Sequence, residues 1–448
     1  MACRLVLSRS PRRNARIAWV YGRDGIAFRV LRGVEAMRSK MSDPGCPGPE
    51  QGNDAAMAQG RAIYLDHNAG AVLRPAVADA MRELIGQAGN ASSVHAPGRA
   101  ARAQIETARS AVAALAGVEA ANVVFTSGAT EANVTALSPV WVDGRGSRSF
   151  DRLLVGACEH PSVLSGGRFA AHAVETVAVD PQGRVDVSQL SQRLGELVSD
   201  GQTVLVSVMA ANNETGVIQP LEEIGQAVQD ASATLHVDAV QAAGRIPLDL
   251  AGWQADSVSL SAHKIGGPQG AGALVLRNAG LHPVSLLTGG GQERRKRAGT
   301  ENVLAIAGFG VAARIALDEI ADWDRLRVLR DGLERDLLHI KEETRVFGQD
   351  AQRLPNTSCF AVPGMPAETV LIALDLEGIA VSSGAACSSG KVSSSHVLAA
   401  MGVDRDLARC ALRVSLGPDT HAEETEAFVA AWRRVSARMR TAGAGRAA

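Results

Sequence analysis

The chain has 448 residues, of which 46% are hydrophobic and 21% are charged, a composition typical of a globular protein with about three domains. The 46 lysines and arginines nearly balance the 47 aspartates and glutamates, and aromatic residues make up only 3%, which excludes a basic or base-stacking surface for direct nucleic-acid binding. Because no run of 18 uncharged apolar residues occurs, we also expect no membrane-spanning helix.

The cysteines are distributed in a way that excludes a disulfide scaffold and a zinc site. No CxxC pair occurs among the six, which stand at positions 3, 46, 158, 359, 387 and 410. We therefore expect a reducing compartment, the cytoplasm, and buried packing as the usual role of an isolated cysteine.

The first 58 residues differ from the rest of the chain in charge. They contain ten basic and five acidic residues, and residues 42–60 are rich in Gly, Pro, Asp and Asn, which predicts a flexible linker. We expect residues 1–58 to be disordered or an over-extended start of the reading frame, since Met41 and Met57 follow within it. An organellar transit peptide is the alternative, although the segment lacks the Ser enrichment and amphipathic period of one.

From residue 61 onward, short apolar runs alternate with helical patterns such as 99–115 and 221–231, which predicts strands connected through helices. Buried strands connected in this way form a mainly parallel sheet with helices on both faces. We therefore predict an α/β fold with a three-layer large domain at residues 74–321. Its expected strands are 122–128, 152–157, 203–209, 234–238, 257–262 and 272–277.

After about residue 322 the pattern changes to long helices. These are expected at 322–343 and 422–439, with shorter strands at 357–362 and 411–416. The change predicts a second, smaller α+β domain. We expect it to comprise residues 59–73 and 322–440, followed by a flexible tail at 441–448.

Two predicted strand ends carry candidate binding residues. The first strand leads through Ser127 and Gly128 into a helix, whose unpaired amides suit a phosphate, although Ser-Gly before a helix is often only a cap. Another strand ends on Asp238, with Gln241 three residues later. A buried carboxylate requires a cation, and either a protonated pyridine nitrogen or a structural ion pair meets that requirement. The carboxyl ends of parallel strands meet at one edge of a sheet, where ligands bind.

The segment SVSLSAHKIGGPQGAGALVL places Lys264 directly after an apolar strand. Four glycines follow within a few residues, at positions 266, 267, 270 and 272, which predicts close approach of the backbone to another group. A lysine between a strand and such a loop fits a Schiff-base lysine that holds pyridoxal phosphate (PLP). A solvated surface lysine is the alternative, and the preceding phosphate-binding helix and Asp238 argue against it.

Seven segments occur in this order along the chain: EHPSV, NNETGVIQP, HVDAVQAAGRIPLDL, SAHKIGGPQGAGAL, GGGQERRKRAGTENV, SSGAACSSG and LRVSLG. Together they closely resemble the cysteine desulfurases of the NifS/IscS group, within the class-V aminotransferase family. The resemblance extends from about Ile63 to Val435. It implies fold type I of the PLP-dependent transferases, a homodimer with active sites at the subunit interface, and conversion of L-cysteine to L-alanine with release of sulfur.

The resemblance implies a role for each matching residue around the cofactor ring. Lys264 is expected to bind the cofactor as a Schiff base and to move the proton of the substrate's α-carbon. Asp238 is expected to keep the pyridine nitrogen protonated, and Gln241 and Asn213 to bind the edge with the phenolic oxygen. His160 is expected to stack on the ring as a further catalytic residue.

The resemblance also implies contacts to the phosphate and the substrate. Arg413 is the candidate for the substrate carboxylate, because a guanidinium matches two oxygens, and Asn90 is a weaker second contact. The residues expected at the phosphate are Ala129, Thr130, Ser261 and His263, with Thr300 reaching the phosphate of the neighbouring subunit.

Cys387 lies in SSGAACSSGKVSSSH, a stretch of small residues that cannot pack a core and therefore predicts an exposed loop. The resemblance implies that its thiolate takes the sulfur of cysteine as a persulfide. The persulfide would pass sulfur to an acceptor protein for iron–sulfur cluster assembly or tRNA thiolation, and it would be a transient iron–sulfur ligand.

The opening YLDHNAGAVLRP departs from the family pattern YLDNNATTP, with His67 in place of Asn and Gly70 and Ala71 in place of two Thr. We expect these changes to affect fine specificity and rate rather than cofactor chemistry. Four alternatives remain: a selenocysteine lyase, a cysteine-sulfinate enzyme, an aminotransferase and a non-catalytic sulfur-transfer partner. The segment around Cys387 and the intact Lys264 and Asp238 favour a desulfurase.

Overall fold

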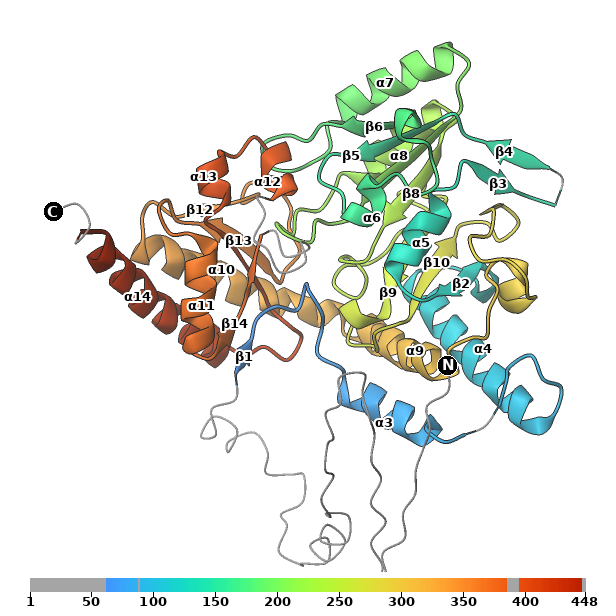
Figure 1. Cartoon of the computed structure of the whole chain (residues 1–448), viewed down its shortest axis with the longest axis horizontal. Helices are drawn as coiled ribbons and strands as arrows, with labels where there is room; N and C mark the ends of the chain where they lie inside the picture. The colour runs from blue at the N-terminus through green and yellow to red at the C-terminus, as the bar shows by residue number, and fades with distance from the viewer. Residues whose placement is uncertain (1–61, 88, 145, 385–394, 445–448) are drawn as a thin grey trace, which may run out of the picture. The chain divides into compact units, whose positions relative to one another are not determined.

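A seven-stranded sheet organises the part of the chain that the computed structural model describes, residues 62–444 except 88, 145 and 385–394 (Figure 1). Its strands run parallel except β10, which is antiparallel to both of its neighbours. All six predicted strands are present, and β6 is an additional strand at one edge. The order across the sheet is β2 (Val123–Thr126), β10 (Gly272–Leu276), β9 (Ser257–Ser261), β8 (Thr234–Asp238), β7 (Val204–Met209), β5 (Arg152–Gly156) and β6 (Val174–Val177).

Every strand of this sheet except the edge strand β6 is buried on both faces, which explains the apolar runs of β2, β5, β7 and β10. Successive side chains point to opposite faces, so Val123 and Phe125 of β2 enter one hydrophobic cluster while Val124 enters another. Along β5, Leu154 joins the first cluster, and its two neighbours join a third. The predicted three-layer α/β class is therefore confirmed.

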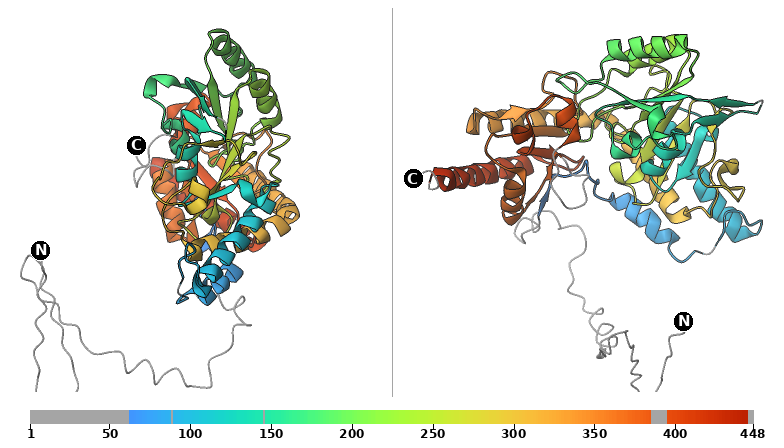
Figure 2. Two further views of the ribbon diagram at one scale, coloured as in Figure 1. Left: turned by 90° about the vertical axis from the view of Figure 1, so that its right-hand side faces the viewer. Right: turned by 45° about the horizontal axis from the view of Figure 1, so that its top comes forward.

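Helices cover both faces of this sheet, and Figure 2 shows them from two further directions. Most of the buried apolar residues of four helices belong to the first cluster: α4 (Ala96–Leu115), α7 (Val187–Ser199), α8 (Leu221–Asp230) and α9 (Val303–Asp318). On the opposite face lie α5 (Ala129–Ala136) and α6 (Pro161–Leu164).

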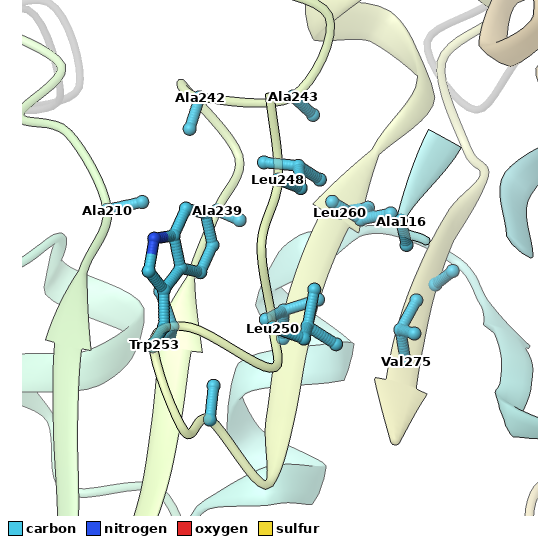
Figure 3. Packing of buried hydrophobic residues seen from close by; sticks show 14 of the residues in the cluster. Ala116, Ala210, Ala239, Ala242, Ala243, Leu248, Leu250, Trp253, Leu260 and Val275 are labelled. Atoms are coloured by element: carbon cyan, nitrogen blue, oxygen red, sulfur yellow. The ribbon is translucent and has the colours of Figure 1, made fainter. Parts of the chain in front are cut away.

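Small residues let large ones pack close to the sheet in the first cluster. Figure 3 shows the indole ring of Trp253 beside Ala210 and Ala239, with Leu250 and Leu260 in the same layer. Each is buried. Close packing of this kind holds the loop that follows β8 against the sheet, and that loop carries part of the site described below.

A four-stranded antiparallel sheet forms a second centre, in the order β12 (Arg345–Val346), β13 (Thr357–Ala361), β16 (Ala411–Ser415) and β15 (Ser382–Ser383). It packs against α10 (Asp324–Ile340), α11 (Ala367–Leu376) and α14 (Ala422–Ala444). Phe360 and Trp432 meet edge to face in this cluster, 5.4 Å between ring centroids.

Short elements complete the described chain. Strand β1 pairs in parallel with β14, and β3 lies between β11 and β4 in a small antiparallel sheet. Their bounds are β1 (Ile63–Tyr64), β3 (Val140–Val142), β4 (Ser147–Ser149), β11 (His282–Pro283) and β14 (Ile379–Ala380), with α3 (Pro75–Leu84), α12 (His396–Ala400), α13 (Arg405–Ala408) and the 3₁₀ turns η2 (Ala120–Asn122), η3 (Ala171–Ala173), η4 (Ala262–Lys264), η5 (Gln292–Arg295) and η6 (Ile320–Trp323).

The predicted domain boundaries at residues 74 and 322 stay predictions. Residues 1–61 and 445–448 lie outside the described residues, and so do the expectations for them. Helix α14 extends to Ala444, whereas a flexible tail was expected from residue 441. In the described part of the chain, no helix is both long and apolar enough to cross a bilayer.

An unusual turn within 293–295 is held by a buried ion pair. Glu293, Arg294 and Arg295 all have positive φ, from 46° to 66°, a backbone region that costs non-glycine residues free energy. The Glu293 carboxylate accepts hydrogen bonds from both Nη atoms of Arg109, at 2.7 and 2.8 Å, and from the amide of Phe125 at 2.8 Å. These bonds tie the turn to β2 and α4.

We expect Arg109→Met to lower the free energy of unfolding by about 3–5 kcal/mol, because it leaves the Glu293 carboxylate buried without its cation. Urea unfolding followed by circular dichroism measures the change. The control is Arg82→Met in the exposed pair with Asp79, which should cost less than about 1 kcal/mol. Equal losses in the two variants would contradict this account of the turn.

Candidate active site

A cleft of about 540 Å³ lies at the carboxyl ends of the parallel strands. Asp238 ends β8 and Ser261 ends β9, while the antiparallel β10 begins at this edge next to Ala271. The structure therefore brings together residues that lie far apart in the sequence. The sequence-predicted residues that line the cleft are Ala129, Thr130, His160, Asn213, Asp238, Gln241, Ser261, His263, Lys264 and Arg413.

One end of the cleft is a backbone cradle at the start of α5. Gly128 precedes the helix, and Ala129 and Thr130 form its first positions. Strand β10 approaches this turn so closely that a Cβ on Gly272 would lie 2.6 Å from the carbonyl carbon of Gly128. The glycine at 272 is thus required for the close backbone approach predicted from the sequence, and the first residues of the helix line the cleft, where their unpaired amides suit an anion.

The Asp238 carboxylate is held by an amide network. Its Oδ2 accepts a 2.7 Å hydrogen bond from Nδ2 of Asn133, and its Oδ1 accepts one from the amide of Val240 at 3.0 Å. Asn133 Nδ2 also donates to Ser162 Oγ, and its Oδ1 lies 3.1 Å from Nε2 of the fully buried His236. The network contains no cation, so the carboxylate is oriented without being neutralised.

His160 is kept neutral beside this carboxylate. Its Nδ1 accepts a hydrogen bond from the Ser162 amide at 3.1 Å and lies 2.8 Å from Ser162 Oγ. Burial lowers the pKa of His160, Asp238 opposes that shift, and Lys264 adds to it. A neutral imidazole packs against an aromatic ring without the desolvation cost of a charge.

Lys264 follows β9 on the 3₁₀ turn η4. Its Nζ donates to the carbonyl oxygens of Asn68 at 2.5 Å and Ala69 at 2.8 Å. The neighbouring His263 has its pKa lowered to about 4 by burial and by the charge of Lys264, so its imidazole is neutral at pH 7. The lysine is therefore placed in the cleft by backbone acceptors, between the cradle and Asp238.

Arg413 is directed into the cleft from β16 by two acceptors. Nη2 donates to Asp66 Oδ1 at 2.6 Å, and Nη1 donates to the carbonyl oxygen of Asn213 at 3.0 Å. Its Nε is buried and has no hydrogen-bond partner among the described residues. A guanidinium held in this way keeps donor capacity for a carboxylate ligand.

The family model for aminotransferase class-V matches residues 63–428. The chain belongs to this family. It is 41% identical over 370 residues to a cysteine desulfurase of Cereibacter sphaeroides, covering 81% of this chain and 93% of the relative. It is 37% identical to the cysteine desulfurase IscS of Dictyoglomus turgidum, covering 85% and 96%. A solved NifS-like protein from Rickettsia africae matches with a TM-score of 0.75 and 34% identity, over 84% of this chain and 99% of that structure.

Class-V aminotransferases are PLP-dependent enzymes, and so is this chain. The donor set of the cleft fits the cofactor: an amine at Lys264, a carboxylate without a cation at Asp238, and a backbone cradle at Gly128 for the phosphate. The closeness of Gly272 to the cradle leaves no space for a side chain there. The predicted family, fold type and cofactor are therefore confirmed.

Two predicted site residues that the structure describes do not line the cleft of this chain. The Asn90 side chain is exposed and accepts a hydrogen bond from the Ser92 amide, and Thr300 is also exposed, away from the cleft. Their predicted roles stay predictions. Cys387 lies outside the described residues, and so does its expected role as an iron–sulfur ligand. Among the described residues, no cluster of His, Cys, Asp and Glu could hold a metal ion.

His67, which departs from the family pattern, does not line the cleft. It lines a small cavity on the other side of Lys264, and a Cβ on Gly417 would lie only 2.0 Å from its ring. Burial, followed by the charge of Arg245, lowers its pKa to about 4. The expected effect of this departure on fine specificity and rate stays a prediction.

Sequence reasoning missed the residues that hold the predicted ones in place. Asn133 orients Asp238, and Asp66 and Asn68 anchor Arg413 and Lys264. Asp66 stands in the segment YLDHNA, in which only the residues that differ from the family pattern attracted a prediction. Asn133 carries no local signal, because an asparagine on a helix becomes informative only when its partner across the cleft is known.

We expect the stability of the protein to fall by about 2 kcal/mol between pH 7 and pH 5 through His236 alone. Burial lowers its pKa from the ordinary 6.5 to about 3, so the unfolded chain binds a proton in this range and the folded chain does not. His236→Gln removes the titrating group while retaining hydrogen-bonding capacity toward Asn133 and Ser257. Urea unfolding at pH 5, 6 and 7 should show a shallower pH dependence for the variant; an unchanged slope would refute the prediction.

Proposed function

We propose that this PLP-dependent enzyme is a cysteine desulfurase, which removes sulfur from L-cysteine and leaves L-alanine. One observation carries the proposal: Lys264, the cation-free Asp238 and the partly unpaired guanidinium of Arg413 line one cleft, in a chain 41% identical to a cysteine desulfurase. These groups suit the amine, ring nitrogen and carboxylate functions that the reaction requires.

PLP, when bound, supplies an electron sink for negative charge at the substrate's α-carbon. Asp238 would hold a proton on the ring nitrogen. Asn133 fixes its Oδ2 atom, and the amide of Val240 fixes its Oδ1 atom. The backbone cradle at Gly128 would hold the phosphate, with Ser261 and the neutral His263 beside it. His160, neutral at pH 7, would pack on the ring.

Arg413 would bind the carboxylate of L-cysteine. Asp66 and the carbonyl oxygen of Asn213 hold two of its nitrogens, so its orientation is set before the substrate arrives. That leaves less rotational entropy to be lost on binding. Lys264 Nζ would then take the proton from the α-carbon of the substrate bound by Arg413.

The thiolate of Cys387 would attack the sulfur atom of the substrate. The S–S bond of a persulfide forms as the C–S bond of cysteine breaks, and the electron pair of that bond remains with the carbon, which gains a proton to give alanine. This role rests on the sequence around Cys387. A protein that assembles iron–sulfur clusters or takes part in tRNA thiolation would accept the sulfur.

We also propose that the enzyme works as a homodimer in the cytoplasm. The exposed position of Thr300 supports the homodimer, because the residue is free to meet a neighbouring chain. The absence of a CxxC pair among the six cysteines of the sequence supports the cytoplasm. In the dimer, Thr300 would reach the phosphate bound by the neighbouring chain. Asn90 would assist Arg413 as a second contact to the substrate.

Lys264→Ala should abolish the visible absorbance of the bound cofactor and lower turnover of L-cysteine by a factor on the order of 10⁴, because both the imine nitrogen and the base are lost. Absorbance spectra and alanine release measure the two effects. The matched control is Lys296→Ala, a half-buried lysine that donates to the Ala279 carbonyl outside the cleft; it should retain both properties. Normal turnover by Lys264→Ala would show that the lysine is assigned wrongly.

Cys387→Ser should keep the absorbance of the bound cofactor and its change on adding L-cysteine, while alanine release falls by several orders of magnitude. A serine hydroxyl is un-ionised near neutral pH and is a poor nucleophile toward sulfur. The control is Cys410→Ser, whose buried thiol bonds the Asp406 carbonyl. Near-normal turnover of L-cysteine by Cys387→Ser, with selenocysteine consumed equally well, would favour a selenocysteine lyase instead.

A further inference from the structure

Arg245 is a buried arginine without a counter-ion. It lies in the loop after β8, is 3% exposed, and has its guanidinium carbon 5.7 Å from the ring centre of Trp323. It forms no ion pair with a described residue, and its Nε has no described hydrogen-bond partner. Burial, followed by the charge of Arg413, lowers its pKa to about 9. A buried, unpaired charge is costly, so its retention calls for an explanation.

Carboxylates do lie near Arg245, but each is bonded to another arginine. Arg245 lines two cavities, one of about 20 Å³ shared with Lys264 and His67, and one of about 510 Å³ on its other side. The described carboxylates on their walls are Glu319 and Asp419, both bonded to Arg74, and Asp324, bonded to Arg327. None of these carboxylates forms an ion pair with Arg245.

The hydrogen bonds of Arg245 lead to the cleft. Its Nη1 donates to the backbone oxygen of Gln241 at 3.2 Å and to the side-chain Oε1 of the same residue. Gln241 Nε2 donates to the carbonyl oxygen of Asn68 at 3.1 Å, and Gln241 lines the cleft. A guanidinium can only donate, so it determines which end of the amide is oxygen. The NH₂ end of Gln241 is thereby the end left for the cleft.

We propose that Arg245 is a positioning residue that acts through Gln241 on the edge of bound PLP, and that its unpaired charge makes the cofactor release its proton more readily. This inference rests on the proposed function and its cofactor. A fixed positive charge favours the deprotonated form of a nearby group, and in a water-poor site it acts with little screening. Locking the Gln241 amide adds an oriented donor at the same edge.

Other charged or titratable groups face the same cleft. They are Glu131 on α5, His160 before α6, Asp238 on β8, His263 and Lys264 on η4, and Arg413 on β16. All remain in place when only Arg245 is changed. A difference between variants at Arg245 therefore reports this residue.

The test is a pH titration of the visible absorbance of the PLP-loaded protein. Arg245→Met should raise the midpoint of that titration by about one unit, because both the charge and the lock on Gln241 are lost. Arg245→Lys, which retains a charged donor, should stay within about 0.3 units of the wild type. If Arg245→Met does not fold, Arg245→Gln, a neutral amide donor, should still raise the midpoint.

Arg330→Met is the matched control. Arg330 is 7% exposed and lines the same larger cavity, but it bonds the Leu354 carbonyl and Asp331 rather than Gln241. Its replacement should change thermal stability without moving the absorbance midpoint. An unchanged midpoint in Arg245→Met or Arg245→Gln, or an equal shift in Arg330→Met, would overturn the proposal. Failure of the wild type to release alanine from cysteine would instead overturn the proposed function. The titration would still test the role of Arg245, because it follows the absorbance of bound PLP and needs no turnover.

Discussion

The site depends on one buried carboxylate that has no cation among the described residues. Asp238 is 5% exposed at the end of β8, where the strand is paired on both sides and cannot move. Such a group requires a positive partner, and its oxygens are already oriented by Asn133 and the amide of Val240. In the proposed function, the protonated ring nitrogen of bound PLP would be that partner. Lys264, His160 and the backbone cradle at Gly128 line the same cleft as this carboxylate.

The charged side chains around the cleft do not all form ion pairs with one another. Arg413 is shared between Asp66 and a backbone oxygen, so its Nε is left over, while Arg245 has no carboxylate at all. His67 and His236 are buried and His263 is half-buried, and burial lowers the pKa of all three, so each is neutral at pH 7. Arg413 thus keeps one carboxylate partner, Arg245 has none, and the three histidines carry no charge.

Local sequence signals predicted the central sheet well, because most of its strands are buried on both faces and are rich in apolar residues. Strand β6 was missed: Val174–Val177 lies at the sheet edge and has two adjacent polar residues between its valines, so it shows no apolar run. The antiparallel direction of β10 was not predicted either. A strand's direction depends on how its connections cross the sheet, and no residue of β10 encodes it locally.

The sequence by itself determined the fold class, the family and the cofactor, and it predicted ten of the residues that line the cleft. These depend on short segments such as SAHKIGG and HVDAVQ, in which residue type and spacing carry the chemistry. Only the tertiary structure decided what holds those residues. Asn133 meets Asp238 across 105 positions, and Asp66 meets Arg413 across 347. Arg245 is four residues from Gln241, yet its lack of a counter-ion becomes visible only when Arg74 and Arg327 are seen to bind the nearby carboxylates. Long-range partners and missing partners are properties of the folded chain, since they depend on which surfaces pack together.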